Sequence, residues 1–169
     1  MLKPKYIILF ALTAFVVILD QWTKSLVLKH FSLQETLPLI NGFFSLTYIR
    51  NTGAAFGMLR DADPSFRIPF FIAVPFVALG VIGYVFRKLP EKDIKMSIAL
   101  SLVVGGAVGN LIDRAQLGYV VDFLDFHWQY LYHFPAFNVA DSAICVGVAV
   151  LMLDLAFREE ESTSASPAH

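Results

Sequence analysis

Four long apolar stretches dominate the pattern of hydrophobic and polar positions along the 169-residue chain. They cover residues 6–28, 68–86, 96–112 and 137–157, and few charged side chains interrupt them. An α-helix needs about 20 residues to cross the hydrocarbon core of a bilayer, because each residue advances it by about 1.5 Å. The pattern therefore predicts an all-α membrane protein with four transmembrane helices.

Two longer connections, residues 30–67 and 113–136, have patterns of their own. In the first, β-branched and aromatic residues partly alternate over 43–50, and NTGAAFG follows, which is typical of a short strand or hairpin. The second carries amphipathic aromatics that favour the headgroup level of a bilayer: Tyr119, Trp128, Tyr130 and Tyr132. We therefore expect a small extracytoplasmic β-element in the first connection and an interfacial loop between helices 3 and 4.

The charge of one short connection orients the helices. Residues 87–95, RKLPEKDIK, contain four Lys or Arg residues, which the positive-inside rule assigns to the cytoplasm. Total Lys and Arg counts on the two sides are nearly equal, so the orientation depends on this short segment. Both termini then also lie in the cytoplasm, in agreement with Lys3 and Lys5.

Composition agrees with a membrane protein and limits its partners. The chain is 57% hydrophobic and 16% charged, with a mean hydropathy of +0.64. We expect one domain over 1–158 and a disordered cytoplasmic tail over 159–169, which is polar and poor in hydrophobic residues. The chain has no basic patch for nucleic acid, and the single cysteine, Cys145, rules out an internal disulfide.

Glycine and proline positions predict features of the middle helices. Gly105 and Gly109 are spaced four residues apart in the third span, a pattern that allows close approach of another helix. In the second span, Pro69 and Pro75 predict the first turn and a kink, respectively.

Ionisable residues in or beside the spans are candidates for function, because charge is costly there. In the predicted orientation, all but one lie toward the outer side: Asp20, Lys24, Asp113, Arg114, Asp122 and Asp141. The exception is Asp154, near the cytoplasmic end, where it can reach water or Arg158, and we interpret it as structural. Asp20 and Lys24 have the i, i+4 spacing of an ion pair on one helix face.

Asp122 and Asp141 lack a neighbouring cation in the sequence, within YVVDFLDF and FNVADSAI. Two carboxyl groups that meet in a partly dry site share a proton, and their apparent pKa values separate. An aspartic peptidase needs that state, because one carboxylate activates water while its protonated partner hydrogen-bonds the scissile carbonyl. An aspartate pair nineteen residues apart nevertheless leaves other functions open.

Two other classes of function fit the same charges. A metal-dependent membrane protease would use Asp122, Asp125, His127 and His133, although the sequence has no HExxH helix. A small transporter or channel would relay protons through buried carboxyl groups, although no internal repeat is visible. A purely structural scaffold is a further alternative.

Five short sequences occur in a fixed order between residues 20 and 141. They are DQWTK at 20–24, NTGAAFG at 51–57, GGAVGNLIDR at 105–114, VDF at 121–123 and FNVAD at 137–141. In these sequences and their order, the chain resembles the lipoprotein signal peptidase (signal peptidase II) family of bacterial aspartic peptidases. The match spans most of the folded chain.

The resemblance implies an enzyme of the bacterial cytoplasmic membrane, with its active site near the outer leaflet. The implied substrate is a diacylglyceryl-modified prolipoprotein, cut immediately before the lipidated cysteine. Membrane lipids are the other expected partner, and we expect a monomer without a metal or other cofactor.

The resemblance also implies roles for individual residues. The catalytic pair would be Asp122 and Asp141, and the loop containing Gly53 would close over the substrate. Substrate-binding residues would be Asn51, Gly53, Asn110, Arg114 and Asn138. Structural support would come from Asp20, Lys24, Asp113 and Ala140.

Overall fold

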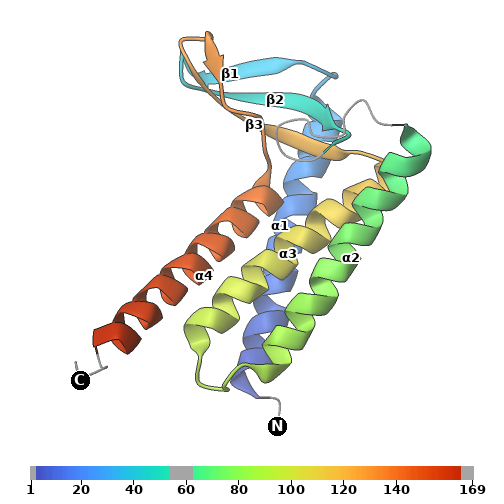
Figure 1. Cartoon of the computed structure of the whole chain (residues 1–169). Helices are drawn as coiled ribbons and strands as arrows, with labels where there is room; N and C mark the ends of the chain where they lie inside the picture. The colour runs from blue at the N-terminus through green and yellow to red at the C-terminus, as the bar shows by residue number, and fades with distance from the viewer. Residues whose placement is uncertain (1–2, 54–62, 165–169) are drawn as a thin grey trace.

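Four long helices form the body of the molecule (Figure 1): α1 (Pro4–His30), α2 (Pro64–Lys88), α3 (Ile94–Leu117) and α4 (Val139–Ser164). The computed structural model describes residues 3–53 and 63–164. Each helix contains a segment long and apolar enough to cross a membrane. Large apolar side chains are exposed on the helices, including Phe10, Val77 and Met152, a surface that suits lipid better than water. The four predicted spans are confirmed by length and composition.

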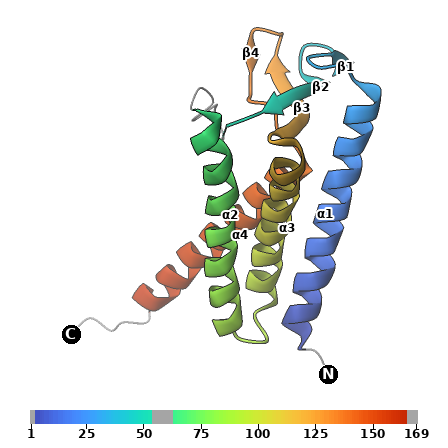
Figure 2. The same cartoon turned by 90° about the vertical axis from the view of Figure 1, so that its right-hand side faces the viewer.

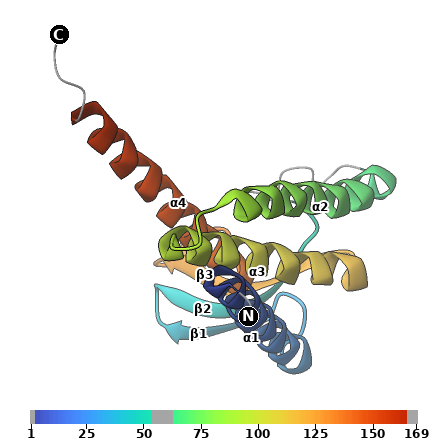
Figure 3. The same ribbon diagram turned by 90° about the horizontal axis from the view of Figure 1, so that it is seen from below.

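Helix α3 lies at the centre and packs against the other three helices (Figure 3). Its glycines explain the close approach. A Cβ at Gly105 would come within 2.8 Å of the Val16 Cβ on α1, and one at Gly109 within 2.7 Å of the Asp20 Oδ2. The packing predicted for these two glycines is therefore confirmed. Helix α4 contacts α3 but diverges from the other helices toward its C-terminal end (Figures 1 and 3).

A small antiparallel sheet lies across one end of the helices (Figure 2). Its strands are β1 (Thr36–Ile40), β2 (Phe44–Asn51), β3 (Val120–Trp128) and β4 (Tyr132–His133), in the order β1-β2-β3-β4. The turn between β1 and β2 contains Gly42 at φ +74°, a backbone conformation that favours glycine. The hairpin predicted around residues 43–50 is therefore present.

The connection between α3 and α4, which we expected to be an interfacial loop, contains two strands, β3 and β4. β3 pairs with β2 from Phe44↔Phe126 to Asn51↔Val120. The run VVDFLDFHW is apolar and aromatic enough for a strand, but its partner lies about 75 residues earlier in the chain. The aromatic side chains Trp128, Tyr130 and Tyr132 remain exposed, as contact with a headgroup region would require.

Helix α2 begins earlier than its prolines suggested. Pro64 is its first residue, and the Asp63 carboxylate caps it by accepting a hydrogen bond of 2.8 Å from Ser65 N. Pro69 therefore lies inside the helix and does not mark its first turn.

The polar tail also differs from expectation. Helix α4 continues to Ser164, so residues 159–164 are helical rather than disordered. The three glutamates at 159–161 are good helix formers, and a helix that is already nucleated extends through them easily. Residues 165–169 lie outside the part of the chain that is described.

A hydrophobic cluster joins the sheet to the helices. Val27 near the end of α1 packs with Tyr48 of β2 and with Val121 and Phe123 of β3. Because Val121 and Phe123 flank Asp122, this cluster fixes the segment of β3 that carries the carboxyl group. Helices α1 and α3 end beside the sheet, whereas α1 begins and α4 ends on the opposite side of the molecule (Figures 1 and 2).

Candidate active site

Asp122 lies in β3 with only 1% of its surface exposed. Successive residues of a strand point to opposite faces, so Asp122 points away from the side chains of Val121 and Phe123. Its carboxylate accepts two hydrogen bonds from amides: Asn51 Nδ2 donates to Oδ2 at 2.9 Å, and Asn138 Nδ2 donates to Oδ1 at 2.7 Å. Among the described residues, this carboxyl group has amide donors as partners and forms no ion pair.

Asp141 lies in the first turn of α4 and forms a reciprocal capping arrangement with Asn138. Asn138 Oδ1 accepts a 2.9 Å hydrogen bond from Asp141 N, and Asp141 Oδ2 accepts one of 3.3 Å from Asn138 N. This is the geometry of a capping box, with Asn as the N-cap and Asp three residues later. Asn110 Nδ2 on α3 donates a further hydrogen bond of 2.7 Å to Asp141 Oδ1. The local sequence Asn138-Val-Ala-Asp141 thus sets the position of this carboxylate.

Asn138 connects the two carboxyl groups. It is fully buried, its side-chain amide contacts Asp122, and its backbone and side-chain oxygen contact Asp141. The pKa of the Asp122 carboxyl is raised to about 7, mainly by burial and then by the charge of Asp141, against the hydrogen bonds from Asn51 and Asn138. The structure therefore brings the two predicted catalytic residues, buried Asp122 and partly buried Asp141, to one amide-lined centre.

A lysine-centred network lies next to this centre. Lys24 Nζ is 2.8 Å from Asp20 Oδ2 and 3.0 Å from Asp113 Oδ2, and it donates to Asn110 Oδ1 at 3.0 Å. The ion pair predicted from the spacing of Asp20 and Lys24 is present. All three donor directions of the ammonium group are occupied, which a buried charge requires.

The same network holds the segments that carry the candidate pair. Asp20 Oδ1 accepts a hydrogen bond of 2.9 Å from Ala140 N, one residue before Asp141. Asp113 Oδ2 accepts one of 3.0 Å from Val121 N, one residue before Asp122. The two acidic residues on α1 and α3 thus fix the starts of α4 and β3.

Arg114 lies at the edge of the site, near the end of α3. Its guanidinium donates to Gly53 O at 3.4 Å and to Asn110 O at 3.5 Å, and it stacks over the ring of Phe71. Gly53 N donates to Asn51 Oδ1 at 3.0 Å, which holds the end of β2 against the site. Residues 54–57 of NTGAAFG lie outside the described residues, so the expected closing loop is described only as far as Gly53.

Sequence reasoning missed Gln21. Its Nε2 donates to Asp113 Oδ1 at 2.8 Å, to Gly109 O at 3.2 Å and to Asp20 Oδ2 at 3.2 Å. Gln21 therefore connects α1 to α3 beside the lysine network. Its position within DQWTK, next to Asp20, was the available signal.

The residues of the alternative metal site are arranged differently. Asp125 Oδ1 contacts His133 Nδ1 at 3.0 Å, while His127 Nε2 contacts Ser45 Oγ at 2.9 Å. Asp122 and Asp125 are three positions apart on β3 and so point to opposite faces. Within residues 3–53 and 63–164, no group of three or more His, Cys, Asp or Glu side chains is arranged to hold a metal ion.

Comparisons with known proteins agree on one family. A family model described as signal peptidase (SPase) II matches residues 12–157. A lipoprotein signal peptidase of Geobacter sulfurreducens is 54% identical over 159 residues, which cover 94% of this chain and 97% of that protein. One of Brevibacillus brevis is 51% identical over 148 residues, covering 86% and 93%.

A solved structure described as a bacterial membrane enzyme has the same fold. It superposes with a TM-score of 0.81 at 32% sequence identity, covering 95% of this chain and 93% of that one. Family model, relatives and fold agree, and the chain therefore belongs to the signal peptidase II family.

Proposed function

We propose that this protein is an aspartic endopeptidase of the bacterial cytoplasmic membrane that removes the signal peptide from diacylglyceryl-modified prolipoproteins. Cleavage occurs immediately before the lipidated cysteine. Relatives called lipoprotein signal peptidases support the substrate class. The observation that carries the chemistry is the contact of one buried amide side chain, Asn138, with both Asp122 and Asp141.

The mechanism follows from the two carboxyl groups. With its pKa raised to about 7, Asp122 holds the shared proton on the acidic side of neutral pH, and Asp141 acts as the base. The ionised carboxylate takes a proton from water as the water oxygen attacks the scissile carbonyl carbon. The protonated carboxyl hydrogen-bonds the carbonyl oxygen, and a proton then passes to the leaving amine as the C–N bond breaks.

The amides around the pair hold it in position for this reaction. Asn51 and Asn138 fix Asp122, while Asn110 and the capping arrangement with Asn138 fix Asp141. Donors fixed in advance do not need to reorganise as charge develops in the transition state. We propose that the same three asparagines also contact the substrate backbone.

Arg114 and Gly53 form the proposed substrate-facing edge. The hydrogen bonds of Arg114 are long, at 3.4 and 3.5 Å, so they are weak and are readily exchanged for a substrate carbonyl. Gly53, which is buried and follows the end of β2 at Asn51, carries one of the carbonyl groups that such an exchange would release.

The position of the site in the fold suits a substrate that arrives through the membrane. A lipidated signal peptide is itself an apolar helix, so it diffuses within the bilayer. Asp122 and Asp141 lie where β3 and α4 begin, at the sheet end of the spans. This end meets the headgroup region on the outer side in our orientation, and water reaches that depth but not the bilayer centre.

The test is a cleavage assay on purified protein with two forms of one precursor, lipidated and non-lipidated, followed by a gel shift. We expect only the lipidated form to be cut, with the cysteine as the new N-terminus. Full activity in the presence of a chelator would separate this mechanism from a metal-dependent protease. Equal cleavage of both forms would contradict the proposed substrate.

A further inference from the structure

Arg50, near the end of the inner strand β2, contacts two tyrosines. Its Nε donates a hydrogen bond of 2.9 Å to the Tyr48 hydroxyl. The guanidinium lies over the Tyr119 ring at 4.8 Å and over the Tyr48 ring at 5.6 Å, measured to the ring centroids. The two hydroxyl groups are 3.2 Å apart, so the tyrosines support each other. Arg50 is thus positioned in advance by contacts that leave its charge uncompensated.

No carboxylate among the described residues lies within 4.0 Å of the Arg50 guanidinium. The terminal nitrogens of Arg50 make no hydrogen bond to the described part of the chain. An arginine fork matches the oxygens of a carboxylate or phosphate, and its full charge favours an anion over a neutral acceptor.

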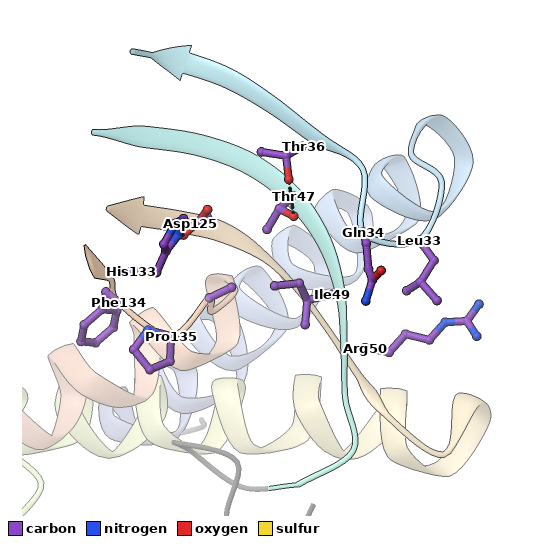
Figure 4. Close-up of a pocket in the computed structure, with 11 residues that line it drawn as sticks. Leu33, Gln34, Thr36, Thr47, Ile49, Arg50, Asp125, His133, Phe134 and Pro135 are labelled. Carbon is purple, nitrogen blue, oxygen red and sulfur yellow. Dashed lines mark hydrogen bonds and ion pairs between the residues drawn. The ribbon is translucent and has the colours of Figure 1, made fainter. Parts of the chain in front are cut away.

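Arg50 lines one end of a cavity of about 670 Å³ on the sheet (Figure 4). Leu33 and Gln34 lie with it at that end, and Ile49 lies nearby. The acidic residue of the cavity, Asp125, is at the other end, paired with His133 at 3.0 Å. The cavity therefore has a cationic end with apolar neighbours.

Gln34 has an unusual backbone at this end of the cavity. Its φ is +67°, a left-handed conformation that costs energy for a residue other than glycine. Its backbone N–H donates to Tyr48 O at 2.9 Å, and its side chain lines the same cavity as Arg50. Gln34 thus places a second polar side chain in the part of the cavity that Arg50 lines.

The location sets the depth of this end of the cavity in a bilayer. Leu33 and Gln34 follow the end of α1 at His30, and Tyr119 follows the end of α3 at Leu117. Both helices are long and apolar enough to span a membrane. Their ends therefore meet the layer of lipid phosphates, and half-exposed Leu33 is available to the glycerol and upper acyl chain.

From these observations we propose that Arg50, held by Tyr48 and Tyr119, binds the phosphate of an anionic phospholipid. The lipid holds the sheet against the membrane surface at the end of β2, one residue from Asn51. The proposal rests on the helices spanning a bilayer and is independent of the proposed peptidase chemistry. Its failure would leave that chemistry untouched.

The test measures lipid retention by the delipidated full-length protein in detergent. The protein is titrated with phosphatidylglycerol, with phosphatidylcholine or with soluble glycerol phosphate, and native mass spectrometry measures how many molecules of each remain bound. We expect one phosphatidylglycerol to be retained in preference to phosphatidylcholine, and little retention of glycerol phosphate. Arg50→Gln should weaken phosphatidylglycerol binding about tenfold or more, since a hydrogen bond between the guanidinium and a phosphate contributes about 1.5 kcal/mol or more.

Lys88→Gln is the matched control. Lys88 also lies over a tyrosine, 5.7 Å from the centroid of Tyr84, but at the far end of α2. Its loss should change retention less than twofold, and Arg50→Lys should give an intermediate loss. Equal losses of phosphatidylglycerol retention for Arg50→Gln and Lys88→Gln would mean that the lipid is attracted by charge without a specific site, and would overturn the proposal. The proposal would also be overturned if Arg50→Gln retained lipid as well as wild type but had a raised KM for the precursor. That result would indicate that the cavity binds peptide.

Discussion

Two groups of carboxylates, buried except for the partly buried Asp141, lie side by side in this protein and differ in their partners. Asp20 and Asp113 share an ion pair with one cation, Lys24, at 2.8 and 3.0 Å. Asp122 and Asp141 instead accept hydrogen bonds from Asn51, Asn110 and Asn138. An ion pair fixes a carboxylate in its charged form, whereas neutral amides hold its geometry while burial still favours a proton. The comparison separates groups suited to support from groups suited to proton transfer.

The largest expected effect comes from removing either member of the amide-held pair. Asp122→Asn and Asp141→Asn should each lower kcat by about 10³-fold or more, because each removes one proton-transfer group. Both variants should remain folded in detergent, since Asn keeps the size of the side chain. Asp125→Asn, on the opposite face of β3, is the matched control and should keep most activity. Robust turnover by either dyad variant would remove the proposed mechanism.

Removing the positive charge of Lys24 should mainly lower the stability of the folded protein. Lys24→Met leaves Asp20 and Asp113 buried without a counter-charge, which costs about 3–5 kcal/mol. Thermal unfolding in detergent should therefore show a much lower Tm than the wild-type protein. Adding Asp20→Asn and Asp113→Asn to Lys24→Met should recover part of that loss. A Tm unchanged by Lys24→Met would mean that the network does not support the fold.

The pH dependence of kcat tests the protonation state of the pair. Asp122, whose pKa is raised to about 7, is protonated below that pH and ionised above it. Activity should fall as pH rises through about 7, because two ionised carboxylates leave no proton for the carbonyl oxygen. Asn51→Ala removes a hydrogen bond that lowers this pKa, so it should move the alkaline limb to higher pH. If the alkaline limb of the pH profile of Asn51→Ala stayed in place or moved to lower pH, the limb would not report the protonation of Asp122.

The smallest effect is expected at the far end of the helices. Asp154 on α4 lies 3.8 Å from Lys95 Nζ, on the side away from the sheet. Asp154→Asn should keep activity within about twofold of wild type, because an exposed partner makes such a pair weak. A complete loss of precursor cleavage would show that this carboxyl group takes part in function. The side chain of Arg158, its other expected partner, lies outside what is described.

The sequence alone determined the features that depend on neighbours along the chain. The four spans follow from apolar length, the ion pair of Asp20 and Lys24 from helical spacing, and the strand over 43–50 from its alternation. Each is a local pattern, set by the geometry of one helix or one strand. The motifs added the family, which the comparisons confirm.

Tertiary structure decided what joins distant segments. The pairing of β3 with β2, the contacts of Asn138 with both carboxyl groups, the bridge through Gln21 and the setting of Arg50 all link residues far apart in the chain. Such contacts depend on how the helices and the sheet pack together, and no periodicity along the sequence encodes them. Packing, rather than spacing, therefore brought Asp122 and Asp141 to one centre.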